Sequence, residues 1–199
     1  MGTGRFLGLE MSTNISGMHH DHGSTCQCTA SSTPYSQNMD EMDFTRGIWS
    51  AALNGEVDQV QKYLDRKCSA DILDSAGYTA LHYAARNGHL NVCKILLDYG
   101  ANPNSLTRAG KASPLHRAAY SGHSNIVKTL IEHGGKLDLA DVDGQTALHK
   151  AAQKSHIEII QHLLKHKPSL SLVKDNLKKL PIDYVPETNR DLQLLLEPS

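Results

Sequence analysis

The sequence lacks an excess of either charge: 20 Lys and Arg stand against 21 Asp and Glu, and the net charge is −1 at pH 7. Binding to a phosphate backbone or to an anionic membrane surface depends on a surplus of positive charge. The chain also lacks an apolar run near the ~20 residues that a membrane-spanning helix needs. We therefore expect neither nucleic acid nor a membrane among its partners.

Cysteine is scarce as well. The four cysteines are too few and too scattered for the disulfide framework of a small secreted domain. The first ten residues carry one basic residue and a short, interrupted apolar patch, which does not fit a secretory signal peptide. These features favour an intracellular protein of the cytoplasm or the nucleus.

The first 40 residues differ in character from the rest. They contain eleven Ser or Thr and five Gly, and their apolar residues recur at neither a helical nor a strand spacing. Such a segment cannot bury enough apolar surface to offset the entropy lost on ordering. We predict a disordered tail over 1–40 and a folded domain over 41–199.

The folded part repeats itself. The segments 77–89 and 144–156 align without a gap as Gly-x-Thr-Ala-Leu-His-x-Ala-Ala, and a third copy at 110–123 carries one extra residue before Pro114. The histidines of the motif, His82, His116 and His149, follow one another at steps of 34 and 33 residues. A looser copy at 51–55 stands 33 residues before 84–88.

A period of ~33 residues with the motif Thr-x-Leu-His-x-Ala-Ala resembles the ankyrin repeat family. The resemblance implies an all-α solenoid whose units each contain a β-turn tip followed by two helices. We divide the domain into four repeats, 41–73, 74–106, 107–140 and 141–173, and a truncated C-terminal cap over 174–199 with Asp183 in place of the histidine.

Comparison of the repeats with one another predicts the core. Val92, Cys93, Leu96 and Leu97 align with apolar residues at 126, 127, 130 and 131 and again at 159, 160, 163 and 164, which is one buried helix face. Cys93 is therefore expected to be a core thiol rather than a nucleophile. No glycine-rich phosphate loop is present, so we expect no enzyme activity and no cofactor. Trp49 stands in the histidine position of the first repeat and is expected to anchor that end.

The histidines invite a metal hypothesis. Two columns, His82/His116/His149 and His89/His123/His156, place equivalent residues on helices ~8–10 Å apart, whereas zinc ligands must approach one ion to ~2 Å. The resemblance implies that the first column forms hydrogen bonds within and between turns. In the tail, Cys-x-Cys is not the Cys-x2-Cys of a zinc knuckle. We therefore favour the interpretation that the tail is disordered and that its His and Cys residues occur there without binding a metal. A metal-handling tail on a passive domain remains an alternative, with His19, His20, His22, Cys26 and Cys28 as candidate ligands.

The resemblance also implies a binding surface, because partners of ankyrin repeats bind along the concave face made by the tips and the adjoining helix ends. Tyr and Arg are the residue types of interface hot spots, and a mildly basic groove suits an acidic segment of a partner protein. We predict a non-catalytic, monomeric adaptor or scaffold that binds another protein. The positions carried over are Tyr78, Arg86, Asn87, Arg108, Lys111, Tyr120, Ser121, Gln145, Gln153 and Lys154.

A second alternative is a modification substrate. Leu96 lies eight residues before Asn104, a spacing that resembles the sites of ankyrin-directed asparaginyl hydroxylases. Under this hypothesis Asn104 is the modified residue.

The tail prediction is testable. A chain shortened to begin at Asp40 should unfold within about 2 °C of the full chain, because the removed residues would contribute no buried apolar surface. Thermal unfolding followed by circular dichroism measures this. A loss of several degrees would show that the tail packs on the domain.

Overall fold

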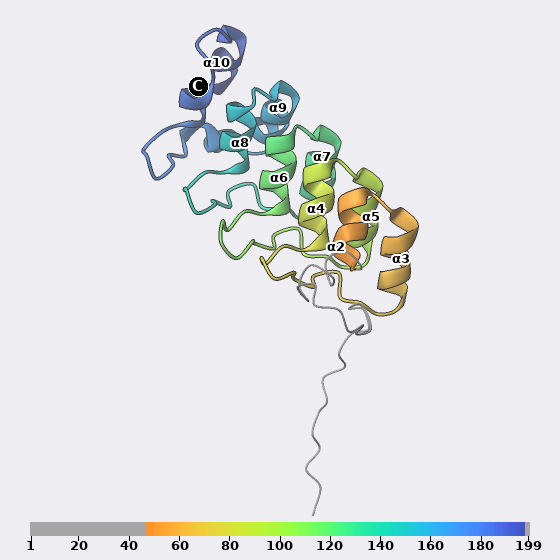
Figure 1. Cartoon of the computed structure of the whole chain (residues 1–199). Helices are drawn as coiled ribbons and strands as arrows, with labels where there is room; N and C mark the ends of the chain where they lie inside the picture. The colour runs from red at the N-terminus through yellow and green to blue at the C-terminus, as the bar shows by residue number, and fades with distance from the viewer. Residues whose placement is uncertain (1–46, 198–199) are drawn as a thin grey trace, which may run out of the picture.

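The computed structural model describes residues 47–197, and the predicted all-α solenoid is confirmed there. Figure 1 shows short helices stacked side by side, with no strand in the described range. Two short 3-10 helices, η1 and η2, precede the last α-helix. The α-helices are α2 (Ile48–Asn54), α3 (Val57–Asp65), α4 (Ala80–Asn87), α5 (Leu90–Asp98), α6 (Pro114–Ser121), α7 (Ser124–Glu132), α8 (Ala147–Gln153), α9 (Ile157–His166) and α10 (Arg190–Leu196), and the 3-10 helices are η1 (Pro168–Leu172) and η2 (Pro181–Tyr184).

The helices form two layers. In the first layer α2, α4, α6 and α8 contact one another in order, and α3, α5, α7 and α9 do the same behind them. The loops that precede α4, α6, α8 and η2 all project on one side of the stack, and we call these loops the tips. The first layer packs closely because its central positions are alanines: Ala84, Ala85, Ala118 and Ala119 are each fully buried.

The second layer buries the predicted apolar face. Val92, Cys93 and Leu96 are completely buried on α5, and the aligned residues of α7 and α9 at 126, 127, 130, 159, 160 and 163 are at most 1 % exposed. Each of these helices therefore contributes the same face to one continuous core. The prediction is less accurate at the end of the face, because Ile131 and Leu164 are only half-buried.

Both ends of the stack are modified. Trp49 is 5 % exposed and its indole N–H donates to the carbonyl oxygen of Ile72 at 3.0 Å, so its predicted place in the core is confirmed. At the other end a 3-10 helix replaces the α-helix of a full repeat. There Asp183 Oδ2 accepts the backbone N–H of Leu180 at 2.7 Å, which is the bond that a motif histidine makes at the start of its helix.

The turn between the two helices of a repeat needs glycine for two reasons. Gly88 and Gly122 adopt φ of +84° and +85°, and a Cβ on them would lie 2.7 Å and 2.6 Å from the rings of His123 and His156 in the next repeat. Ser155 occupies the same place in the fourth repeat with φ of +56°. The cap that follows has no histidine at the corresponding position, so a side chain fits there and only the backbone strain remains.

Ser155→Gly should therefore stabilise the protein by about 1 kcal/mol, since glycine adopts a positive φ without the steric cost that a Cβ carries. Urea unfolding gives the difference. Gly122→Ser is the matched control and should destabilise, because its new side chain meets the ring of His156. A Ser155→Gly midpoint at or below that of the parent chain would contradict this account.

Candidate functional site

Each tip is closed by its first residue. Asp74 Oδ1 accepts the backbone N–H of Tyr78 at 2.7 Å, and Asp141 and Asp175 close their own tips in the same way at 2.9 Å. Short polar side chains favour such turns because they replace a missing backbone partner. The tips are thus held in one conformation without a strand.

Neighbouring tips are also joined to one another. The backbone N–H of Val142 donates to the carbonyl oxygen of Gly110 at 3.0 Å, and Arg108 Nη1 donates to the carbonyl oxygen of Ser75 at 3.3 Å. The tips therefore make a continuous surface along the edge of the solenoid.

The first histidine column connects each helix start to the following tip. His82 Nδ1 accepts from the backbone N–H of Thr79 at 3.1 Å, so Nε2 carries the proton and donates to the carbonyl oxygen of Ala112 at 3.0 Å. His116 and His149 repeat this arrangement. Burial lowers the pKa of His82 to about 4 and also lowers the pKa of the other two.

The hydrogen-bonding role expected of this column is confirmed, and its rings have no nitrogen left for a metal.

The second histidine column, His89, His123 and His156, links repeats in the opposite direction, from a turn back to the end of the preceding first-layer helix. Residues 47–197 contain no group of three His, Cys, Asp or Glu placed to hold a metal ion. In the second column each ring Nε2 donates to a backbone carbonyl oxygen: His89 to Leu53 at 2.8 Å, His123 to Arg86 at 3.1 Å, and His156 to Tyr120 at 3.1 Å.

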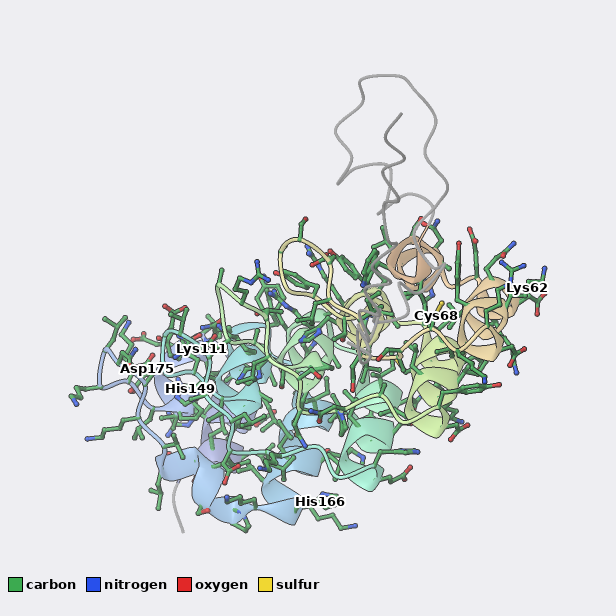
Figure 2. The ribbon with its side chains drawn as sticks, turned by 90° about the horizontal axis from the view of Figure 1, so that it is seen from below. Lys62, Cys68, Lys111, His149, His166 and Asp175 are labelled. Atoms are coloured by element: carbon green, nitrogen blue, oxygen red, sulfur yellow. The ribbon has the colours of Figure 1, made fainter. Side chains whose placement is uncertain are left out.

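Most positions predicted for the binding surface lie on the tips or on the C-terminal ends of the first-layer helices. Lys154 Nζ stands 4.7 Å from the centre of the Tyr120 ring, so these two already form one cation–aromatic pair. In Figure 2 Lys111, on the third tip, lies far from Lys62 on α3. The exposed members are Arg86, Asn87, Arg108, Lys111, Tyr120 and Lys154, and the half-buried members are Tyr78, Ser121 and Gln153.

Gln145 requires a correction. It is only 6 % exposed, and its amide nitrogen donates to the hydroxyl oxygen of Tyr184 at 2.8 Å. Its amide oxygen accepts from Lys150 Nζ at 2.7 Å and from Gln153 Nε2 at 2.9 Å. The cap covers this tip position, so Gln145 holds the fourth repeat against the cap instead of facing a partner.

Asn104, the predicted modification residue, lies between two repeats. Its Oδ1 accepts the backbone N–H of Lys136 at 2.7 Å and its Nδ2 donates to the carbonyl oxygen of Gly134 at 3.0 Å. Both polar atoms are thus engaged in joining the repeats. The tail metal ligands predicted from the sequence lie outside the described residues.

Sequence analysis missed Arg117. Its Nη2 donates to the hydroxyl oxygen of Tyr78 at 2.7 Å, and its guanidinium carbon lies 5.1 Å from the centre of that ring. A signal was present, because the position between each motif histidine and the alanine pair carries a side chain that can form hydrogen bonds: Tyr83, Arg117 and Lys150.

Within residues 47–197 the cysteines do not provide an activated thiol. Cys93 is free and fully buried, and burial raises its pKa to about 12. Cys68 is disulfide-bonded. Among the described helices, none combines the length and the apolar character needed to cross a bilayer.

The sequence profile of the family described as "Ankyrin repeats (3 copies)" matches residues 48–141 and 102–174. The chain belongs to the ankyrin repeat family. This confirms the resemblance drawn from the motif, and ankyrin repeats generally serve protein–protein interaction and are not catalytic.

Individual relatives match over shorter stretches. The human ankyrin repeat domain-containing protein 39 is 47 % identical over 85 residues, which is 43 % of this chain and 46 % of the relative. The Bos taurus protein of the same name is 51 % identical over 67 residues, 34 % of this chain and 37 % of the relative. Palmitoyltransferase akr1 of Schizosaccharomyces pombe is 37 % identical over 68 residues, 34 % of this chain but 11 % of that protein. The chain thus spans less than half the length of each.

The buried histidines predict a pH-dependent stability. Burial lowers the pKa of His82 from 6.5 to about 4, so below pH 6.5 the unfolded chain binds a proton that the folded chain excludes. The stabilisation is complete above ~pH 7 and is lost as the pH falls towards 4, by on the order of 3 kcal/mol for this residue. Urea unfolding at successive pH values measures the slope.

His82→Gln provides the comparison. This variant lowers stability at every pH, but its free energy of unfolding should change less steeply between pH 6.5 and 4, since one titrating group is gone. An unchanged slope would mean that other groups dominate the acid sensitivity.

Proposed function

We propose that the chain is a non-catalytic adaptor or scaffold whose tips and adjoining helix ends bind an acidic segment of another protein. The tip surface, as we call it, comprises Tyr78, Arg86, Asn87, Arg108, Lys111, Tyr120, Ser121, Gln153 and Lys154. Membership of the ankyrin repeat family supports an interaction function, and the chemistry of this surface supports the acidic partner.

The observation that carries the proposal is the lack of internal counter-charges on this surface. Within residues 47–197 the ion pairs involve Lys128, Lys150, Lys167 and His133. None of them includes Arg86, Arg108, Lys111 or Lys154. No carboxylate of the described residues therefore neutralises these four cations, which come from three successive repeats, and complementary charge would guide the approach of an acidic segment.

Aromatic groups add contact area among the cations. Tyr120 is 46 % exposed and can contribute apolar contact, and Tyr78, on the neighbouring repeat, is half-buried. Tyr and Arg dominate the binding energy of many interfaces because they combine apolar area with hydrogen bonds. An extended segment with carboxylates and apolar side chains fits this composition.

The proposal includes a monomer in the cytoplasm or the nucleus. The scattered cysteines and the near-neutral charge of the sequence support that compartment, and the Cys68 disulfide is the observation that opposes it. Sedimentation of the full chain and imaging of the tagged chain in cells test the two parts separately.

Charge reversal tests the binding surface. Arg86→Glu with Arg108→Glu should lower capture of protein partners from cell extract at least tenfold, because two charge-assisted contacts become repulsive. Capture by the parent chain should also weaken as salt is raised. Quantitative mass spectrometry of proteins retained on the immobilised full chain gives the measurement.

Lys62→Glu is the matched control, since Lys62 is an exposed cation on α3 remote from Lys111 and the tips. It should leave capture unchanged. All variants should unfold within ~0.5 kcal/mol of the parent, as exposed substitutions do. Loss of the partner in the control and its retention in the double variant would place binding on the outer helices and refute the proposal.

A further inference from the structure

One repeat lacks an internal contact that its neighbours share. In the second repeat the hydroxyl of Tyr83, next to the motif histidine, donates to Asp74 Oδ2 at 2.6 Å. In the fourth repeat Lys150 Nζ lies 2.6 Å from Asp141 Oδ2, and in the cap Tyr184 donates to Asp175. The aspartate that opens each of these tips therefore uses one oxygen for its own turn and the other for the residue after the histidine column.

The third repeat has threonine at that place. Thr107 Oγ1 accepts the backbone N–H of Ala112 at 3.1 Å, so the turn is closed as in the other tips. A hydroxyl has no second oxygen, however. In the third repeat the residue after the motif histidine is Arg117, and it therefore has no tip carboxylate to bind. The third tip is one residue longer than the others, yet its first side chain still closes the turn, and the counter-charge is absent.

Arg117 is left with unused donors. Its Nη2 donates to the hydroxyl oxygen of Tyr78, its guanidinium carbon lies 5.1 Å from the centre of that ring, and its Nε, which is buried, meets no acceptor. No carboxylate of residues 47–197 forms an ion pair with it. A guanidinium held in place by stacking loses little entropy when it binds a carboxylate, which it matches with two parallel hydrogen bonds.

Arg117 borders a surface hollow between the third and fourth tips. Tyr120, Lys150, Asp141 and Asp143 also line it. Lys150 and Asp141 neutralise each other, and Asp143 is exposed to solvent. Arg117 has no such carboxylate partner among residues 47–197, so its positive charge beside this hollow is unpaired.

We propose that Arg117 is the anchor of the tip surface and binds a side-chain carboxylate of Asp or Glu in the partner segment, supplying from outside the counter-charge that Thr107 does not provide. The inference rests on the proposed function and makes it more specific. It also predicts that restoring the missing aspartate in the chain itself blocks the site.

The test uses the full chain and a fluorescent, N-acetylated hexaglutamate amide as probe. Thr107→Asp should weaken binding at least tenfold, because the new carboxylate occupies Arg117 as Asp141 occupies Lys150. Arg117→Gln should weaken it to the same extent by removing the donors. Thr107→Asn keeps the oxygen that closes the turn without adding charge, and it should bind within about twofold of the parent chain.

A second control separates a local effect from general repulsion. Ala109→Asp adds the same charge to an exposed position of the same tip and should weaken binding less than threefold at 0.15 M salt, where exposed charges are screened. Thermal unfolding shows whether Thr107→Asp is folded, and it should melt at or above the parent temperature. If Thr107→Asp does not fold, the affinity of Arg117→Gln for hexaglutamate tests the proposal instead.

Several results would overturn the assignment: no saturable hexaglutamate binding up to millimolar concentration, parent-like binding by folded Thr107→Asp or by Arg117→Gln, or equal competition by inorganic phosphate. If Arg86→Glu with Arg108→Glu lowers partner capture while Thr107→Asp does not, the anchor is wrong and the proposed function stands. If neither variant lowers capture, the tip surface itself is refuted.

Discussion

The fold depends on a neutral histidine buried between consecutive repeats. Its Nδ1 must accept from the start of its own helix and its Nε2 must donate to the next tip, as His82 does between Thr79 and Ala112. Only one tautomer of the uncharged ring satisfies both bonds, and burial favours that uncharged form. The third tip, the fourth tip and the loop of the cap are consequently each positioned by the histidine of the repeat before them.

The second histidine column imposes a separate constraint. Its rings fill the space where a Cβ would stand on Gly88 or Gly122, so glycine there serves both the backbone conformation and the approach of the next repeat. Ser155 shows that the two requirements are separable, because it retains the positive φ where no histidine follows. Departures from the repeat are thus informative about what each position does.

The same logic connects structure to function. Positions that stack the repeats are used identically in each unit and leave little for a specific partner to recognise. A repeat with a missing internal contact differs from its neighbours in charge while its tip is still closed by a side chain, as with Thr107 and Arg117. A solenoid can acquire a binding site in this way without a pocket or a change of fold, because the tip keeps its backbone bonds.

The sequence by itself determined the repeat period, the helical units, the burial of Cys93 and its aligned residues, and the role of Trp49, because in a solenoid each repeat contacts only its neighbours and local pattern suffices. It also placed most of the candidate surface. Only the tertiary structure showed that Gln145 is covered by the cap and that Arg117 is held by a tyrosine of the preceding repeat. Each contact joins residues 39 apart, Gln145 with Tyr184 and Arg117 with Tyr78. Sequence alignment of the repeats gives equivalent positions, but whether a neighbouring unit covers a side chain or leaves it without a counter-charge depends on contacts between units.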